Sequence, residues 1–165
     1  MKNNLFWFRR DLRLHDNAGL YHALKSDLPI IPIFIFDTDI LDNLPSKDAR
    51  VEFIHNVLTD LDTQLQALGA SLQVYYGKPL EVWSDIVKEY NISKVYTNHD
   101  FEPYAIKRDS AVKDMLAIND VGFLTFKDHV IFEKDEITKA DGLPYSVFTP
   151  YKKKWLAKVE DRRNV

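Results

Sequence analysis

The sequence predicts an α/β protein built on a doubly wound, Rossmann-like, five-stranded parallel sheet with helices on both faces. Several apolar runs lack polar alternation, which is typical of strands covered on both faces. Between them lie segments with apolar residues at steps of three and four, which is typical of amphipathic helices. The two kinds of segment alternate along the chain, as parallel strands joined by helical crossovers require.

The expected strands are short and apolar. The strongest covers residues 29–36, PIIPIFIF, and stops at Asp37. Its two prolines remove backbone donors, so we expect the first half of this strand to lie near an edge or at the entry of the sheet. The five expected strands are residues 4–8, 29–36, 72–76, 94–97 and 121–126.

Four helices are expected from their capping residues and their apolar spacing. Asp16 or Asn17 is the expected N-cap of the first, and Gly69 ends the long second helix. Pro79 and Pro103 stand in the first turns of the third and fourth. The apolar positions of the long helix are Val51, Ile54, Val57, Leu58, Leu61, Leu65 and Leu68.

The pattern weakens after about Lys127, where the chain becomes polar and rich in turn residues. We therefore expect two parts: an α/β domain over residues 1–130, and a linker with the start of a helical connection over 131–165. In the second part an apolar stripe follows helical spacing, and we expect it to dock against another domain or a second copy of the chain. The stripe consists of Tyr151, Trp155, Leu156 and Val159.

Composition excludes several classes of function. The chain has 165 residues, about one domain's length, and a net charge of −3, so any contact with nucleic acid must be local. Without cysteine it has no disulfide, thiolate nucleophile or Cys-ligated metal. It offers neither a signal-peptide core nor an apolar run of about 20 residues, so we expect a cytoplasmic protein.

Common motifs of nucleotide and metal sites are missing. The five glycines form neither dinucleotide-binding nor P-loop patterns, and the five histidines lack ligand spacing. Asp37 and Asp39 suggest the paired aspartates of haloacid-dehalogenase phosphatases, but Leu41 stands where that motif prefers Thr or Val. The simpler interpretation is that Asp37 caps the strand end. A stand-alone nucleotide-binding protein of the doubly wound type remains an alternative.

An arginine-rich segment, WFRRDLRLHDN, occupies residues 7–17 at the end of the first strand. Its guanidinium groups can hold a phosphate or carboxylate at the edge where doubly wound sheets bind ligands. The alternative is structural, with Arg13 and Asp16 in buried ion pairs that fix the first turn.

This segment resembles the opening signature of the DNA photolyase and cryptochrome family, specifically its cyclobutane-dimer photolyase branch. Residues 98–104, NHDFEPY, resemble the family's loop after the fourth strand. Residues 145–155, YSVFTPYKKKW, resemble the segment that leads into its helical domain. The three matches follow the family's order along nearly the whole chain.

The resemblance implies the antenna domain of a light-harvesting flavoprotein. In the family this α/β domain holds an antenna chromophore and is joined to a helical domain that holds catalytic FAD. The parent protein would then be a lyase that repairs pyrimidine dimers in DNA with light, or alternatively a cryptochrome photoreceptor. We expect the helical FAD-binding domain as partner, contact with DNA only through the intact parent, no catalytic residue here, and no repair by this chain alone.

The resemblance also implies a pigment site. The matching residues are Arg10, Asp37, Arg50, Asp100 and Glu102. Phe34, Phe36 and Phe101 are candidates for its aromatic wall. Folate-binding members carry an Asn-Glu pair where this chain has Tyr104 and Ala105, so a flavin-type pigment, a deazaflavin or FMN, is favoured over folate.

Overall fold

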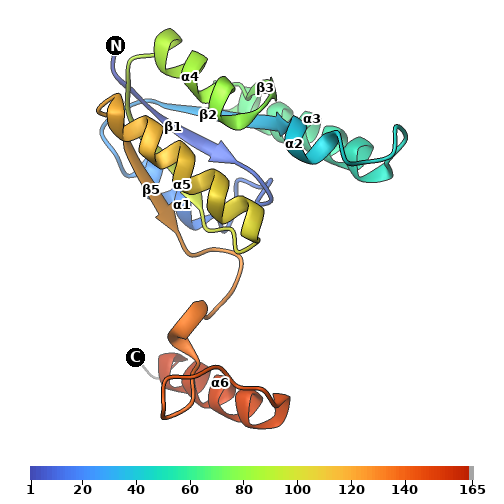
Figure 1. Cartoon of the computed structure of the whole chain (residues 1–165). Helices are drawn as coiled ribbons and strands as arrows, with labels where there is room; N and C mark the ends of the chain where they lie inside the picture. The colour runs from blue at the N-terminus through green and yellow to red at the C-terminus, as the bar shows by residue number, and fades with distance from the viewer. Residues whose placement is uncertain (164–165) are drawn as a thin grey trace. The chain divides into compact units, whose positions relative to one another are not determined.

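The computed structural model describes residues 1–163. The chain divides into two compact units, and the boundary along the sequence falls between His129 and Val130. The first unit holds a five-stranded sheet in the order β3-β2-β1-β4-β5, and every neighbouring pair is parallel (Figure 1). The strands are β1 (Asn3–Phe8), β2 (Ile30–Asp37), β3 (Gln73–Gly77), β4 (Ile92–Asn98) and β5 (Gly122–Phe126). The predicted fold class is confirmed.

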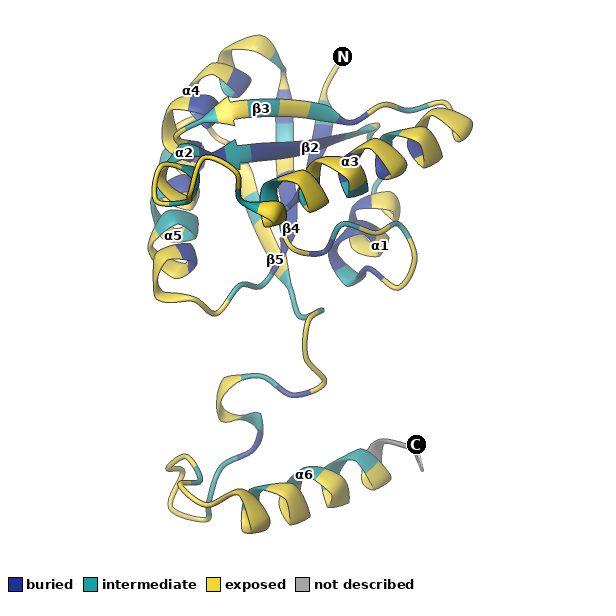
Figure 2. Ribbon diagram, turned by 90° about the vertical axis from the view of Figure 1, so that its right-hand side faces the viewer, coloured by how far each residue is buried: buried dark blue, intermediate teal, exposed yellow. Residues whose placement is uncertain are grey.

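Helices cover both faces of this sheet, α4 and α5 on one side and α1 and α3 on the other (Figure 2). The helices of the first unit are α1 (Ala18–Leu24), α2 (Thr38–Leu41), α3 (Ala49–Ala67), α4 (Pro79–Glu89) and α5 (Pro103–Ile118). The short α2 was not predicted. Asp37 forms its N-cap and accepts a hydrogen bond from the Asp39 amide at 3.0 Å, which agrees with the capping interpretation of this aspartate.

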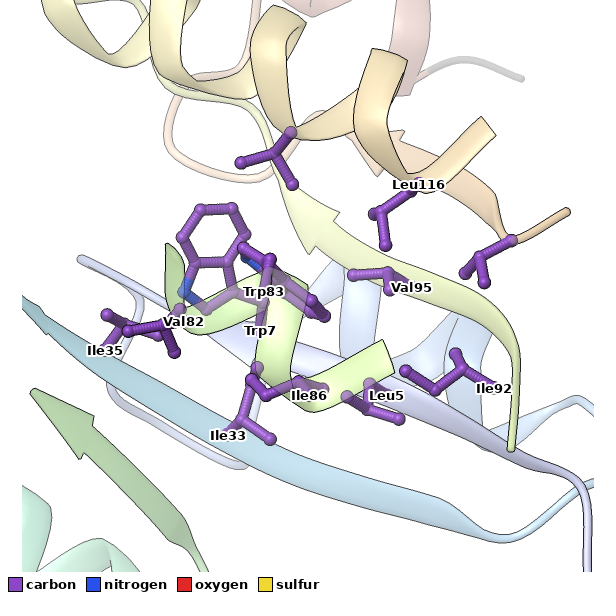
Figure 3. Close-up of a cluster of buried hydrophobic side chains, with 12 residues drawn as sticks. Leu5, Trp7, Ile33, Ile35, Val82, Trp83, Ile86, Ile92, Val95 and Leu116 are labelled. Carbon is purple, nitrogen blue, oxygen red and sulfur yellow. The ribbon is translucent and has the colours of Figure 1, made fainter. Parts of the chain in front are cut away.

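The central strand β1 supplies side chains to two separate cores because successive residues of a strand point to opposite faces. Leu5 and Trp7 pack under α4 and α5, and Figure 3 shows Trp7 beside Trp83 and Leu5 near Ile86. Phe6 and Phe8 pack under α1 and α3. All four are buried, which explains the unbroken apolar run of this strand.

The register of β2 accounts for its prolines. Residues 30–34 of β2 pair with β1, whereas pairing with β3 begins only at Ile33. Pro32 therefore lies where β2 has a neighbour on one side only, although the strand is internal as a whole. This confirms the expectation that the first half of the strand lies at the entry of the sheet.

Buried polar groups fix the turn from β1 into α1. The carboxylate of Asp11 accepts hydrogen bonds from the Arg9 amide at 3.0 Å and from the side-chain amides of Asn17 and Asn98. Asn17 also caps α1 by accepting from the Leu20 amide at 3.1 Å. Asp11, Asn17 and Asn98 are each at most 4 % exposed, so their polar groups form hydrogen bonds with one another where water has little access.

Arg13 has a structural role in the same turn. Its guanidinium contacts the Asp128 carboxylate at 2.8 Å and the backbone carbonyl of Asp16 at 2.5 Å. Asp128 also accepts from the Ala18 amide at 2.9 Å, so it joins the end of β5 to the start of α1. Arg13 therefore does form an ion pair in this turn, but the prediction of a buried pair involving Asp16 is wrong: the carboxylate is that of Asp128, and the Arg13 side chain is 42 % exposed.

The second unit contains a single-turn 3-10 helix, η1 (Lys134–Glu136), and α6 (Phe148–Arg163). Part of the predicted apolar stripe is covered inside this unit, because Trp155 packs edge-to-face on Phe132 with ring centroids 5.7 Å apart. Leu156 and Phe148 remain exposed. Within residues 1–163, no helix has both the length and the apolar character needed to span a bilayer.

Candidate functional site

The candidate site lies where the carboxyl ends of β1, β2 and β4 meet. The strand order places β1 beside β4 at the point where the chain changes direction across the sheet, and doubly wound folds bind their ligands at such a point. Arg10 follows β1, Asp37 ends β2, and Asp100 and Glu102 follow β4. Four of the five predicted residues therefore come from neighbouring strands at one edge.

Arg10 joins two of these acidic residues. Its Nη2 lies 2.6 Å from Oε1 of Glu102, and its Nε lies 3.4 Å from Oδ2 of Asp100. The hydrogen bond to Glu102 raises the pKa of the Arg10 guanidinium, so it stays charged. The Asp100 side chain is 8 % exposed, whereas those of Arg10 and Glu102 are 53 % and 60 % exposed. Arg10 is thus available to a ligand from solvent.

Arg108 is a second, buried guanidinium at the centre of the cluster. Its Nη1 lies 3.9 Å from Asp37 and its Nη2 4.0 Å from Asp100, separations beyond a direct hydrogen bond. Its closest carboxylate is Asp109, at 3.0 Å. The side chain is only 9 % exposed, so it is packed inside the protein with its donors near Asp37 and Asp100.

Asp109 connects Arg108 to Arg9, whose Nη1 contacts it at 2.5 Å. Burial lowers the pKa of the Arg9 guanidinium, and the charge of Asp109 partly offsets this effect. Arg9 also donates to the backbone carbonyl of Asn98. Both guanidinium groups lie over the Trp7 ring, at 5.1 Å for Arg9 and 5.0 Å for Arg108. Arg9, Arg108, Asp109 and Trp7 thus form a layer of contacting side chains below the residues that face solvent.

Tyr104 closes the cluster on the side of β2. Its hydroxyl donates to Oδ2 of Asp37 at 2.7 Å. Burial raises the pKa of Asp37, an effect that the Tyr104 hydrogen bond and Arg108 reduce. The pKa of Tyr104 is also raised, first by burial and then by Asp37, so the phenol stays neutral.

Arg50 does not join this cluster. It lies in the first turn of α3, where its Nη2 contacts the neighbouring carboxylate of Asp48 at 2.6 Å. This pair lowers the pKa of Asp48 to about 2. The Arg50 side chain is 72 % exposed.

The predicted aromatic wall is mostly elsewhere. Phe34 is buried in the core between the sheet and the helices α1 and α3, where Phe36 packs against it with ring centroids 5.0 Å apart. Phe101 is exposed beside Asp100. Of the three phenylalanines, only Phe101 adjoins the acidic loop and is accessible.

Sequence reasoning did not assign Tyr104, Arg108 or Asp109 to the site. The signal was present, because Tyr104 and Arg108 are one helical turn apart at the start of α5, directly after the acidic loop. Residues four apart share a helix face, so an aromatic and a cation there point the same way. Across residues 1–163, no group of three or more His, Cys, Asp or Glu side chains is arranged to hold a metal ion.

Comparison with known proteins supports the same family as the sequence motifs. A family model described as DNA photolyase matches residues 4–164. This chain belongs to the DNA photolyase family. A deoxyribodipyrimidine photo-lyase of Synechococcus is 34 % identical over 153 residues, and a cryptochrome-1 of Aedes aegypti is 33 % identical over 156. The family therefore includes both photolyase and cryptochrome relatives of this domain.

A solved structure shares the fold. The photolyase of Sulfolobus tokodaii, described with two FAD molecules that imply a novel light-harvesting cofactor, matches with a TM-score of 0.77 and 32 % identity. The match covers 93 % of this chain and 34 % of that one. The Synechococcus match covers 93 % of this chain and 32 % of the photo-lyase, and the Aedes match 88 % and 29 %. The chain thus spans about a third of the length of these relatives and corresponds to the family's amino-terminal α/β domain.

Proposed function

We propose that this domain binds a flavin-type antenna pigment, a deazaflavin or FMN, at the carboxyl edge of its sheet. The observation that carries the proposal is the placing of Arg10 and Arg108 between three carboxylates at the switch point between β1 and β4. Those carboxylates are Asp37, Asp100 and Glu102. Hydrogen-bond donors and acceptors therefore lie side by side in this site, which suits a ligand that carries both kinds of group.

A flavin-type ring system has this character. Its ring carbonyls and, in FMN, its phosphate accept hydrogen bonds, for which the Arg10 and Arg108 guanidinium groups supply donors. Its ring N–H and ribityl hydroxyls donate, and the carboxylates accept. The half-exposed Arg10 and the exposed Phe101 provide the solvent-facing side. Pterin-like folates remain less favoured, because Tyr104 stands at the expected Asn position and is engaged with Asp37.

Arg50 is an outer contact in this proposal. The helix α3 follows β2 and α2, so its first turn begins on the side of the carboxyl edge. The Arg50 guanidinium pairs with the neighbouring Asp48, and because the Arg50 side chain is 72 % exposed, breaking this pair costs little. Arg50 can therefore exchange Asp48 for an acidic group of the ligand.

The role of the bound pigment is physical. It absorbs near-ultraviolet or blue light and passes the excitation to FAD in the helical domain of a longer parent, where dimers in DNA are repaired; this domain itself makes or breaks no bond in that process. The light-harvesting cofactor named for the Sulfolobus protein supports this role. The cryptochrome relatives support a photoreceptor as the second candidate for the parent.

A fluorescence titration tests the proposal. The purified chain is titrated with FMN, a deazaflavin, a reduced folate and ATP, while pigment and tryptophan emission are followed together. Saturable binding of FMN or deazaflavin is expected, with no competition by ATP. Preference for the folate would contradict the pigment class, and preference for ATP would favour a nucleotide-binding protein. Absence of any binding would contradict a pigment site formed by this domain alone.

A further inference from the structure

Tyr104 and Asp37 form a donor and acceptor pair for a proton at the edge of the candidate site. They lie 67 positions apart in the chain, on α5 and at the end of β2, and the phenol oxygen is 2.7 Å from the carboxylate. Asp39 lies on the same side, at 3.4 Å from the phenol oxygen. The Tyr104 residue is 37 % exposed, so part of it is accessible from solvent.

The geometry of this pair favours movement of the proton from the Tyr104 phenol to the Asp37 carboxylate. The raised pKa of Tyr104 keeps it on the phenol in the ground state. A phenol that loses an electron becomes a strong acid, and it then needs an acceptor within hydrogen-bond reach. Asp37 is such an acceptor, and burial raises the pKa of its carboxyl and so favours the protonated form.

We propose that Tyr104 is the electron donor to a light-excited flavin bound at this edge and that Asp37 takes its proton. The inference rests on the flavin site proposed above. One electron passes from the Tyr104 ring to the excited flavin, which is reduced by one electron, while the phenolic proton moves to Oδ2 of Asp37. The reverse transfer of electron and proton restores Tyr104, Asp37 and the oxidised pigment, so the cycle consumes no other reagent.

Trp7 is the competing aromatic donor in this part of the fold, and its surroundings oppose oxidation. Guanidinium groups lie over the ring at 5.1 Å and 5.0 Å, and positive charge near a ring disfavours the removal of an electron from it. Asp109 offsets part of this charge. Tyr104 has a single guanidinium at 5.8 Å and a carboxylate directly on its hydroxyl, so it is the easier of the two to oxidise.

The pair limits how long the pigment stays excited. Electron transfer from Tyr104 competes with the passage of excitation to a second pigment. It also returns the excited pigment to its ground state when no second pigment is in reach. Tyr104 is thus a residue that tunes the excited-state lifetime, distinct from the residues that hold the pigment.

The test measures the fluorescence lifetime of FMN bound to the full chain, together with the tyrosyl radical absorbance after a laser flash. Tyr104→Phe keeps the ring and removes the transferable proton, and Asp37→Asn keeps the helix cap and removes the proton acceptor. We expect a several-fold longer lifetime of bound FMN in Tyr104→Phe, with loss of the radical signal. In the parent chain the lifetime should be longer in deuterated water, because a proton moves with the electron. Asp37→Asn is expected to lengthen the lifetime and to abolish this isotope effect.

Tyr21→Phe is the matched control, because Tyr21 is exposed on α1 and has Lys25, not a carboxylate, as neighbour. Its lifetime and radical yield are expected to equal those of the parent chain. An unchanged lifetime in Tyr104→Phe at saturating FMN would overturn the inference while leaving the flavin site intact. A lifetime restored only when Trp7→Phe is added would overturn it as well, because Trp7 would then be the donor.

A chain that does not bind FMN still tests the pair. Flash excitation of free FMN in solution oxidises accessible tyrosines on collision, and the part due to Tyr104 is the difference between the parent chain and Tyr104→Phe. That part is expected to fall several-fold in Asp37→Asn. If Asp37→Asn leaves it unchanged, or if Tyr104 contributes no radical, the coupling of Tyr104 to Asp37 is disproved independently of the binding site.

Discussion

Gly19 of α1 touches Asn98 of β4 so closely that no side chain fits between them. The Gly19 amide donates to Oδ1 of Asn98 at 2.8 Å, and a Cβ on Gly19 would lie 2.6 Å from the same oxygen. It would also lie 3.2 Å from the backbone of Thr97. The α1 helix therefore packs on the strand only because residue 19 lacks a side chain.

Replacing this glycine should loosen the packing of α1 on β4. We expect Gly19→Ala to lower the free energy of unfolding by about 1–3 kcal/mol, because the added methyl group forces backbone to shift. Urea denaturation followed by tryptophan fluorescence measures the change. Gly122→Ala is the matched control, since its Cβ would meet the flexible side chain of Lys94 at 3.2 Å. Equal losses in the two variants would contradict this reason.

Asp11 should be more important for stability than its small size suggests. Its carboxylate accepts from Asn17 and Asn98, and all three are buried. Asp11→Ala removes the acceptor of the Arg9 amide and of one N–H of the Asn98 side chain, which costs about 1–3 kcal/mol of the free energy of unfolding for each group. Thermal denaturation gives the change, with Asp85→Ala as control because Asp85 pairs with Lys88 at the surface. A loss in Asp11→Ala as small as in the control would show that water replaces the carboxylate.

The fold could be predicted from the sequence because its strands and helices carry their own local signals. The unbroken apolar run of β2 is compatible only with a buried strand, and the three-and-four spacing of α3 only with a helix. The N-cap Asn17 and the first-turn Pro103 marked where two helices begin. The short α2 escaped prediction because its four residues make too little periodicity to detect. Local patterns are therefore enough for the elements that form the sheet.

The candidate site was predicted only in part, for a physical reason. The family resemblance singled out Arg10, Asp100 and Glu102, and the structure brings these three side chains together after β1 and β4. Which arginine reaches which carboxylate depends on side-chain directions that no spacing encodes. Arg108 thus became central without being predicted, while Arg50 remained with its neighbour Asp48.

The ionisation of Asp37 should make stability depend on pH. Burial raises its pKa above the ordinary value of 3.8, so the folded state binds the proton more tightly than the unfolded state does. This group therefore stabilises the fold most below pH 3.8, and its contribution is lost as pH rises through the higher, folded-state pKa. Asp37→Asn lacks this titration, so its stability relative to the parent should increase from about pH 3 to neutral pH. A constant difference in urea midpoint across that range would contradict the raised pKa.

Arg108 should stabilise the unit as well as line the site. Its removal in Arg108→Met leaves Asp37, whose side chain is 7 % exposed, without the guanidinium 3.9 Å away, and Asp109 without its partner at 3.0 Å. Breaking a buried ion pair from one side typically costs about 3 kcal/mol, and we expect a loss of that size in the free energy of unfolding. Lys107→Met is the control with the same charge change on the exposed face of α5. Comparable losses in both variants would show that helix charge, and not the cluster, is responsible.

The order of affinities in a charge-removal series should follow the depth of each cation in the site. Arg10 lies on Asp100 and Glu102, and a lost charge-assisted hydrogen bond costs about 1.5 kcal/mol, so Arg10→Ala should weaken flavin binding about tenfold. Arg50→Ala should weaken it about threefold or less, because an exposed contact contributes under about 1 kcal/mol. Lys88 lies in the last turn of α4, at the amino edge of the sheet, so Lys88→Ala removes the same charge without touching the site. An equal loss of affinity in all three variants would mean that long-range charge attracts the pigment. A larger loss in Arg50→Ala than in Arg10→Ala would move the site from the β1–β4 junction toward α3.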